Sequence, residues 1–176
     1  LLSLIAGLDS PTSGEVSIND QQLGRMKEKA LARFRAKNIG IVFQQFHLMP
    51  HLTASENISL PLELTRDPDA HEKAIGILDK IGLSHRKNHF PYQLSGGECQ
   101  RVAIGRALVV EPAILLADEP TGNLDEKTGD QLSNILFDLV ESINMTLLLV
   151  SHNKVLAGRC ARKLTLKNGE LKDDLV

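Results

Sequence analysis

The chain has 176 residues, enough for one substantial hydrophobic core, and its apolar and charged fractions of 42% and 24% are those of an ordinary globular domain. A formal charge of -2 gives no general reason to expect nucleic acid or an anionic membrane surface as a partner. The two cysteines, Cys99 and Cys160, are too few for a disulfide framework or a metal cluster, which favours a reducing compartment. No apolar run approaches the ~20 residues of a bilayer span, so any membrane association must come through a partner.

The first elements expected along the chain are short. Residues 1–6 suit an apolar helix that Gly7 ends, and because neither an initiator Met nor a cap precedes them, we expect the chain to be truncated at its N-terminus. The pattern then predicts, in order, a strand at 15–18, a turn at 19–20, a basic surface helix at 27–37 and a buried strand at 39–43 that ends at Gln44.

A repeated capping pattern marks the helix starts in the middle of the chain. An Asp, Ser or Thr is followed three residues later by Glu, so that each side chain can accept a hydrogen bond from the other residue's backbone N–H. The pattern occurs at 53–56, 69–72 and 95–98, and the third helix is expected to run to about Val110. Because no strand pattern occurs between about 52 and 90, we predict a helical insertion, with a helical subdomain over about 52–110 in one domain of residues 1–176.

Strands and helices alternate in the C-terminal part. The runs at 113–117 and 146–150 indicate buried parallel strands, apolar residues between 132 and 143 recur at helical spacing, and Asn168-Gly169 indicates a hairpin turn. This alternation predicts an α/β fold with a mostly parallel sheet flanked by helices.

Two adjacent acids, Asp118 and Glu119, follow the strand expected at 113–117. They should lie at the C-terminal edge of the sheet, where open α/β folds bind ligands. One carboxylate can hold Mg²⁺ and the other can orient and deprotonate an attacking water; since successive strand residues point opposite ways, they should not share one role. The alternative is a strand followed by a solvated acidic turn.

The helix expected after Ser95 has a start suited to phosphate. Ser95 is the expected N-cap, and the two glycines allow a ligand to approach the free N–H groups and the positive end of the helix dipole. For this motif by itself, a well-capped helix with no ligand is the better interpretation. The residues concerned are Ser95, Gly96, Gly97 and Glu98.

His152 and Gln44 also follow expected strands. His152 could donate a hydrogen bond to a terminal phosphate, although a lone histidine after a strand is more often structural. Gln44 could ligate metal or water through its amide oxygen, but alone it would mean little. The remaining histidines are expected on the surface: His47, His51, His71, His85 and His89.

The order of these features resembles the ABC ATPase family over essentially the whole chain. The resemblance rests on Gln44, Leu-Ser-Gly-Gly-Glu at 94–98 (the signature segment), Gln-Arg at 100–101, Asp-Glu at 118–119, Gly-Asn-Leu-Asp at 122–125, and His152. It implies a P-loop NTPase-like fold with a helical subdomain and an ATPase that uses ATP and Mg²⁺.

The resemblance also implies a role for each position. Gln44 is similar to the glutamine that contacts Mg²⁺ or the attacking water, and Asp118 to the aspartate that binds Mg²⁺. Glu119 is similar to the general base, His152 to the histidine that senses the γ-phosphate, and Asp125 to the aspartate of the loop that crosses the dimer interface.

The signature segment implies a dimer. Ser95, Gly96, Gly97 and Glu98 would serve ATP bound by the opposite protomer, so each protomer of a two-fold homodimer would supply half of each site. The other implied partner is an integral membrane permease, which would hold the subunit at the cytoplasmic side of the plasma (inner) membrane. No nucleic acid is expected.

Two positions differ from the common family pattern. Glu98 stands where many relatives have Gln and keeps the capping function, and residues 122–125 are Gly-Asn-Leu-Asp rather than Ser-Ala-Leu-Asp. The second variant, with Phe-His-Leu-Met-Pro at 46–50, is similar to the branch serving lipoprotein release, macrolide export and cell division.

The phosphate-cradling loop of the family, G-x-x-x-x-G-K-[ST], does not occur in the 176 residues. In relatives it precedes the helix that residues 1–7 resemble, so we expect the chain to begin just after it, with the loop and the first strands absent. Since the loop supplies most of the positive field around the phosphates, we expect this segment alone to bind ATP very weakly and not to hydrolyse it at a useful rate.

Two other functions remain open beside transport. One is an ABC-type ATPase acting on chromosomes or ribosomes. Chromosome-type relatives carry long coiled coils, and this chain sustains no heptad repeat. Ribosome-acting relatives carry two such domains in one chain, which this short segment does not exclude. The other is a non-catalytic binding or regulatory fragment.

Overall fold

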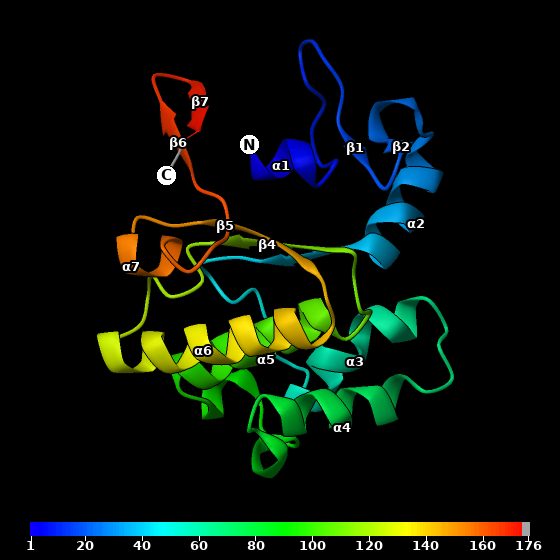
Figure 1. Cartoon of the computed structure of the whole chain (residues 1–176). Coiled ribbons are helices and arrows are strands. Elements are labelled where there is room, and N and C mark those ends of the chain that lie inside the picture. The colour runs from blue at the N-terminus through cyan, green and yellow to red at the C-terminus, as the bar shows by residue number, and fades with distance from the viewer. Residues whose placement is uncertain (174–176) are drawn as a thin grey trace.

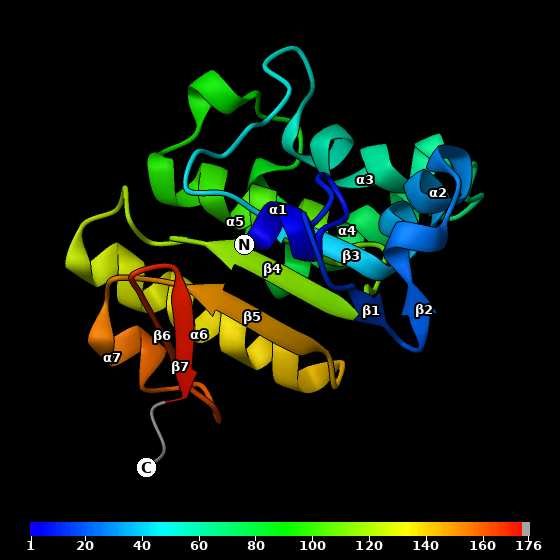
Figure 2. The same ribbon diagram turned by 90° about the horizontal axis from the view of Figure 1, so that it is seen from above.

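The fold centres on a parallel sheet of three strands. In the computed structural model, which describes residues 1–173, β3 (Ile39–Val42), β4 (Ile114–Asp118) and β5 (Thr146–Val150) lie in the order β3-β4-β5. Figure 2 shows β4 between its two neighbours, with all three strands running the same way. Their carboxyl ends therefore meet at one edge of the sheet.

Two small hairpins lie outside this sheet. β1 (Ser17–Ile18) pairs with β2 (Gln21–Gln22), and β6 (Leu164–Lys167) pairs with β7 (Glu170–Asp173). Both turns need two residues with positive φ: Asn19 and Asp20 have 49° and 60°, and Asn168 and Gly169 have 53° and 83°. Asn, Asp and Gly tolerate a positive φ best, which explains why these residues form the turns. Both predicted turns are confirmed.

The helices fill the stretches between the strands. The first part of the chain contains α1 (Leu2–Ile5), the 3-10 turn η1 (Leu23–Arg25) and α2 (Glu28–Asn38). Between β3 and β4 come α3 (Ala54–Leu64), α4 (Ala70–Lys80), η2 (Ser84–Arg86), η3 (Pro91–Gln93) and α5 (Gly96–Leu108). The last part contains α6 (Glu126–Ser142) and α7 (Lys154–Ala157).

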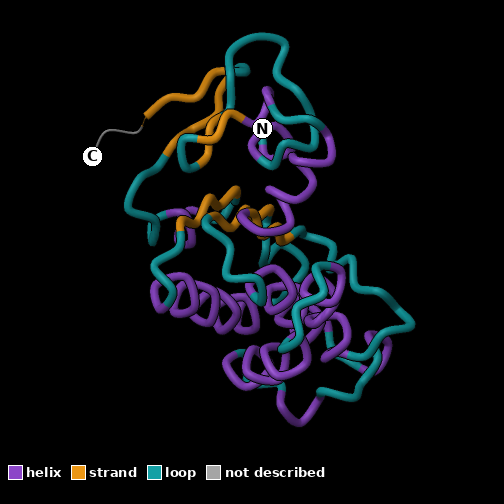
Figure 3. The backbone as a smooth tube through the Cα atoms, turned by 90° about the vertical axis from the view of Figure 1, so that its right-hand side faces the viewer, coloured by secondary structure: helices purple, strands orange, loops and turns teal. Residues whose placement is uncertain are grey.

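The sheet separates two layers of unequal size. Figures 1 and 3 show α3, α4, α5 and α6 on one side of it and α1, α2 and the hairpins on the other. β4 is buried between them because its side chains alternate: Leu115 and Ala117 belong to the large core with α3–α6, whereas Leu116 packs with Ala6 and Ile39 in the smaller one.

Two of the three predicted capping boxes are confirmed. Thr53 with Glu56 and Ser95 with Glu98 make both reciprocal hydrogen bonds at the starts of α3 and α5. The box predicted at Asp69 is wrong, because the side chain of Asp69 makes no capping hydrogen bond to α4. Instead the backbone N–H of Asp69 donates to the carboxylate of Asp67, at 2.9 Å.

β5 differs from its predicted burial. The sequence predicts a buried strand, yet Thr146 and Val150 are exposed and the three leucines between them are half-buried. β5 lies at one end of the described sheet and has β4 as its only strand neighbour within residues 1–173. Among these described residues, no helix has the length and apolar character needed to cross a bilayer.

Candidate nucleotide-binding site

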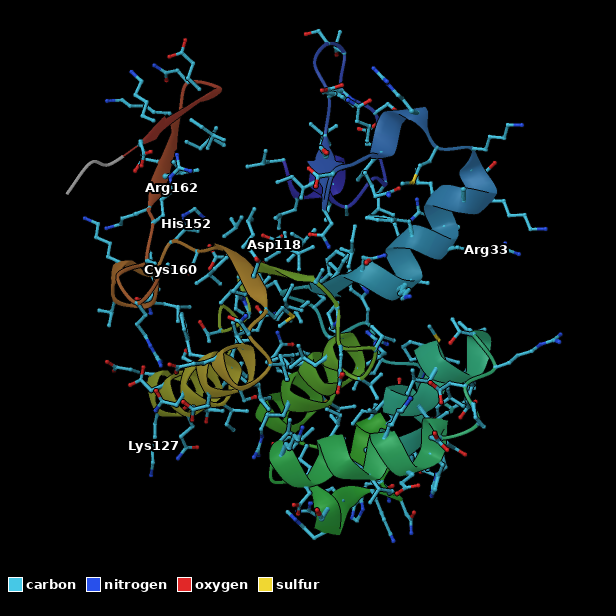
Figure 4. All side chains as sticks on the ribbon, turned by 45° about the vertical axis from the view of Figure 1, so that its right-hand side comes forward. Arg33, Asp118, Lys127, His152, Cys160 and Arg162 are labelled. Atoms are coloured by element: carbon cyan, nitrogen blue, oxygen red, sulfur yellow. The ribbon has the colours of Figure 1, made fainter. Side chains whose placement is uncertain are left out.

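The residues predicted from strand ends meet at one edge of the sheet. Gln44 follows the end of β3 by two residues, Asp118 is the last residue of β4, and His152 follows the end of β5 by two. Figure 4 shows Asp118 and His152 at this edge. Parallel pairing in register, with Val42 opposite Ala117 and Asp118 opposite Val150, produces this convergence.

The carboxylate of Glu119 is fixed by groups that follow β5. The backbone N–H of His152 donates to Oε1 at 2.7 Å, and the hydroxyl of Ser151 donates to Oε2 at 3.1 Å. The backbone of Glu119 itself has a φ of 44° and donates to the Val150 carbonyl at 2.9 Å. The side chain therefore leaves β4 in a direction that the strand alone would not give it, toward the β5 end of the edge.

The ring of His152 lies beside the same carboxylate but faces solvent. Its Nε2 is 3.6 Å from Oε1 of Glu119, and its side chain is fully exposed. The contact is an ion pair only when the ring is protonated. His152 is thus the residue of this edge whose side chain is most open to an incoming ligand.

The amide of Gln44 is tied to the loop after Glu119. Nε2 of Gln44 donates to Oδ1 of Asn123 at 3.2 Å, and Nδ2 of Asn123 donates to the backbone carbonyl of Gln44 at 2.9 Å. Gly122 makes this approach possible, since a Cβ there would lie 3.0 Å from Nε2 of Gln44 and 3.4 Å from Cβ of Glu119. The side chains of Gln44 and Glu119 are therefore close neighbours.

The oxygens at this edge fit Mg²⁺. The carboxylate of Asp118 and the amide oxygen of Gln44 have no hydrogen-bond or ion-pair partner in the described part of the chain. Free carboxylate and amide oxygens suit Mg²⁺, which is commonly held by one or two carboxylates together with waters and substrate phosphates.

The start of α5 packs against the loops that follow β3 and β4. Ser95 and Gly96 are exposed there and Gly97 is buried. A Cβ on Gly96 would lie 3.7 Å from Leu124 and from Phe46. Within residues 1–173 no hydrogen bond or ion pair joins the signature segment to Asp118, Glu119 or His152. The structure thus brings Gln44, the two acids and His152 to one edge, and none of them has a hydrogen bond or ion pair with the signature segment in the described residues.

The profile of the ABC transporter family matches residues 1–122. The chain belongs to the ABC transporter family. A relative in Escherichia coli, the uncharacterized ABC transporter ATP-binding protein YbbA, is 48% identical over 176 residues, covering 99% of this chain and 77% of that protein. The lipoprotein-releasing system ATP-binding protein LolD of Hydrogenovibrio crunogenus is 46% identical over 171 residues, covering 96% of this chain and 74% of that protein.

Solved structures of the family confirm the predicted fold. A dimeric ATP-binding cassette in a post-hydrolysis state, bound to ADP and Pi, superimposes with a TM-score of 0.87 at 40% identity, over 98% of this chain and 78% of its own. A second dimeric bacterial ABC transporter cassette gives a TM-score of 0.86 at 41% identity, over 97% of this chain and 76% of its own. The predicted family and its P-loop NTPase-like α/β fold are therefore correct.

Asp125 caps the start of α6. It is the N-cap of α6, and its carboxylate accepts from the backbone N–H of Thr128 at 3.0 Å. That interaction with Thr128 holds the pKa of Asp125 below its usual value. Asp125 therefore fixes where the loop after Glu119 ends and α6 begins.

Sequence reasoning assigned no role to three polar residues whose hydrogen bonds join the loops at this edge of the sheet. Ser151 and Asn123 are the two already described, and neither belongs to a pattern that predicts its partner. The third is Gln100, which is fully buried in α5 and donates to the carbonyls of Phe43 at 3.1 Å and Pro120 at 2.9 Å. Gln100 is among the residues that carry the family resemblance, but neither that resemblance nor the local sequence predicts its two acceptors.

Proposed function

We propose that the intact protein binds and hydrolyses ATP to power a transporter through a membrane permease, and that Glu119 is its general base. The observation that carries this is the fixed carboxylate of Glu119 at the C-terminal edge of the sheet, next to Asp118, whose carboxylate has no partner within residues 1–173. Membership of the ABC transporter family and the likeness to a cassette bound to ADP and Pi support the reaction.

Each residue at this edge of the sheet would have a separate role in ATP hydrolysis. Glu119 would accept a proton from water as the water oxygen attacks the γ-phosphorus, and the bond between that phosphorus and the ADP oxygen would break. Gln44 would orient that water through its amide oxygen, and His152 would donate to the γ-phosphate. Asp118 would hold Mg²⁺, which when bound offsets negative charge on the phosphates.

We also propose a homodimer as the working form. The signature segment makes no hydrogen bond or ion pair to Asp118 or Glu119 in the described residues, and its start at Ser95 and Gly96 is exposed, so it would serve ATP held by a second copy, with Asp125 at the boundary between the copies. The dimeric state of both solved cassettes supports this arrangement. The helices between about 52 and 110 would form a subdomain within one domain of residues 1–176, and the permease would hold the subunit at the cytoplasmic face of the membrane.

Glu119→Gln tests the assigned base. The substitution keeps the size of the side chain and one acceptor oxygen, but it replaces the other oxygen with NH₂ and removes the basic carboxylate, so ATP hydrolysis by the intact protein should fall by about 100-fold or more. ATP should still bind, which equilibrium dialysis would show. Glu126→Gln, an exposed change in the first turn of α6, is the matched control and should leave the rate near wild type. A Glu119→Gln protein that hydrolyses ATP at the wild-type rate contradicts the proposal.

A finer proposal concerns residues 1–176 by themselves. They contain no G-x-x-x-x-G-K-[ST] loop, and the carboxylates of Asp118 and Glu119 would repel a polyanion. We therefore expect calorimetric titration of this segment with MgATP to show binding far weaker than that of the intact protein. Micromolar affinity for the segment alone would refute this expectation.

A further inference from the structure

We infer that Asn123 is a positioning residue that orients the side-chain amide of Gln44 for the reaction, an inference that rests on the function proposed above. Gln44 and Asn123 exchange two hydrogen bonds, one from each side-chain NH₂ group. A primary amide has a donor end and an acceptor end. Because Asn123 engages the donor end of Gln44, the oxygen is the end left for a metal ion or a water molecule.

The close fit around Gly122 restricts the amide further. A Cβ at residue 122 would touch Nε2 of Gln44 at 3.0 Å and its Cδ at 3.4 Å, and the same point is 3.4 Å from Cβ of Glu119. The plane of the Gln44 amide thus lies against the backbone turn that follows Glu119. Any rotation that swapped its oxygen and nitrogen would place the oxygen against Oδ1 of Asn123, where two acceptors repel.

The backbone beneath the pair is braced from inside the protein. The buried NH₂ of Gln100 donates to the carbonyl of Phe43, which precedes Gln44, and to that of Pro120, which follows Glu119. Only the nitrogen end can serve two carbonyls, so the orientation of the Gln100 amide is fixed; its buried oxygen has no partner in the described residues. Gln100 therefore sets the spacing of the two segments, and Asn123 sets the direction of the Gln44 side chain above it.

This pairing depends on an asparagine at position 123. In the common Ser-Ala-Leu-Asp form of this loop the equivalent residue is alanine, which has neither donor nor acceptor. Asn123 is exposed, so its two bonds add little to the stability of the fold and are better explained by what they do to Gln44. A residue that only braced the loop would act on stability and would not depend on Gln44.

The test is a double-mutant cycle in the intact protein, with Asn123→Ala, Gln44→Ala and the double variant. We expect Asn123→Ala to lower the kcat for ATP about three- to tenfold and to raise the Mg²⁺ concentration needed for half the maximal rate, with an unchanged Tm. In the Gln44→Ala background, Asn123→Ala should cause no further loss. Asn134→Ala removes an exposed asparagine from α6 as a matched control and should leave both kinetic values unchanged.

A second readout needs no nucleotide. In wild type, nuclear magnetic resonance should show slower exchange of the Gln44 side-chain amide protons than in Asn123→Ala. Three outcomes would overturn this inference and leave the proposed function standing. The rate losses of the two single variants could multiply in the double variant, or Asn123→Ala could hydrolyse ATP at the wild-type rate while Gln44→Ala is slow. The third outcome is equal exchange of the Gln44 amide protons in wild type and Asn123→Ala. A wild-type rate for Gln44→Ala would overturn the role proposed for Gln44 and this inference with it.

Discussion

At the scale of single residues, Glu98 joins the start of α5 to the turn η2. Its Oε2 accepts from the backbone N–H of Ser95 at 2.8 Å, and its Oε1 accepts from Nε of Arg86 at 3.0 Å. Partial burial raises the pKa of Glu98, but these hydrogen bonds outweigh it and hold that pKa below its ordinary value of 4.5. The ionised form is therefore stabilised by folding.

This shift predicts an acid-sensitive contribution to stability. A carboxyl whose pKa is lower in the folded protein stabilises the fold fully above about 4.5 and loses that contribution as the pH falls through the folded pKa. Glu98→Gln keeps the cap but removes the charge, so the free energy of unfolding should fall by about 1 kcal/mol at pH 7, with the difference closing below about pH 4. Urea unfolding from pH 7 to 3 measures it.

Glu72→Gln provides the control for Glu98→Gln. Glu72 occupies the same third position of its helix, α4, but is exposed and has no side-chain hydrogen bond among the described residues. Its substitution should change stability little at any pH. If both variants lose stability equally, the contribution of Glu98 does not come from Ser95 and Arg86.

At the scale of elements, α5 and α6 meet at a point where only glycine fits. A Cβ on Gly97 would lie 2.5 Å from Cγ2 of Thr128, closer than real Cβ contacts allow. Thr128 belongs to the first turn of α6, where its N–H is capped by Asp125. This contact fixes the start of the signature helix against the first turn of α6.

Gly97→Ala should therefore destabilise the intact protein by about 1–3 kcal/mol through overpacking. Adding Thr128→Ser to Gly97→Ala deletes the clashing methyl group and should restore most of the lost stability. The comparison variant is Gly76→Ala at an exposed position of α4, where a Cβ would meet nothing within 4 Å. There the better helix propensity of alanine should stabilise by about 0.5–1 kcal/mol. Urea unfolding of the four proteins separates the effects, and failure of Thr128→Ser to rescue would locate the strain elsewhere.

At the scale of the whole molecule, the sequence was sufficient for the architecture. The strands at 39–43, 113–117 and 146–150, the hairpin turns and most helices lie within a few residues of their predicted positions because each depends on local patterns. Parallel pairing then brings Gln44, Asp118 and His152 to one edge without further information. The burial of β5 was not predictable in this way, since it depends on which elements lie beside the strand.

The contacts that the sequence could not predict are those between polar groups far apart in the chain. Gln44 and Asn123 are separated by 79 residues, and Ser151 and Glu119 by 32. A hydrogen bond of this kind depends on the positions of two loops after folding, and no periodicity records it. Even the local prediction at Asp69 failed, because the carboxylate of Asp67 supplies the hydrogen bond to the backbone there.

The shared site of the proposed dimer can be tested by complementation between two inactive variants of the intact protein. Glu119→Gln removes the base, and Gly96→Asp places a negative charge at the exposed start of α5. Asp is favourable in the first turn of a helix, and the added Cβ would meet only ordinary contacts at 3.7 Å, so Gly96→Asp should fold while repelling phosphate. Each variant alone should be inactive.

If Glu119 of one copy works with the signature segment of the other, a mixed dimer carries both lesions in one site and none in the second. Mixing equal amounts should then restore ATP hydrolysis, to about a quarter of the wild-type rate when the subunits exchange freely and the sites act independently. If instead each site belonged to a single chain, every site in the mixture would keep one lesion and no activity would return. A mixture as inactive as its two components therefore contradicts the shared site, whereas recovery requires residues from two copies in one active centre.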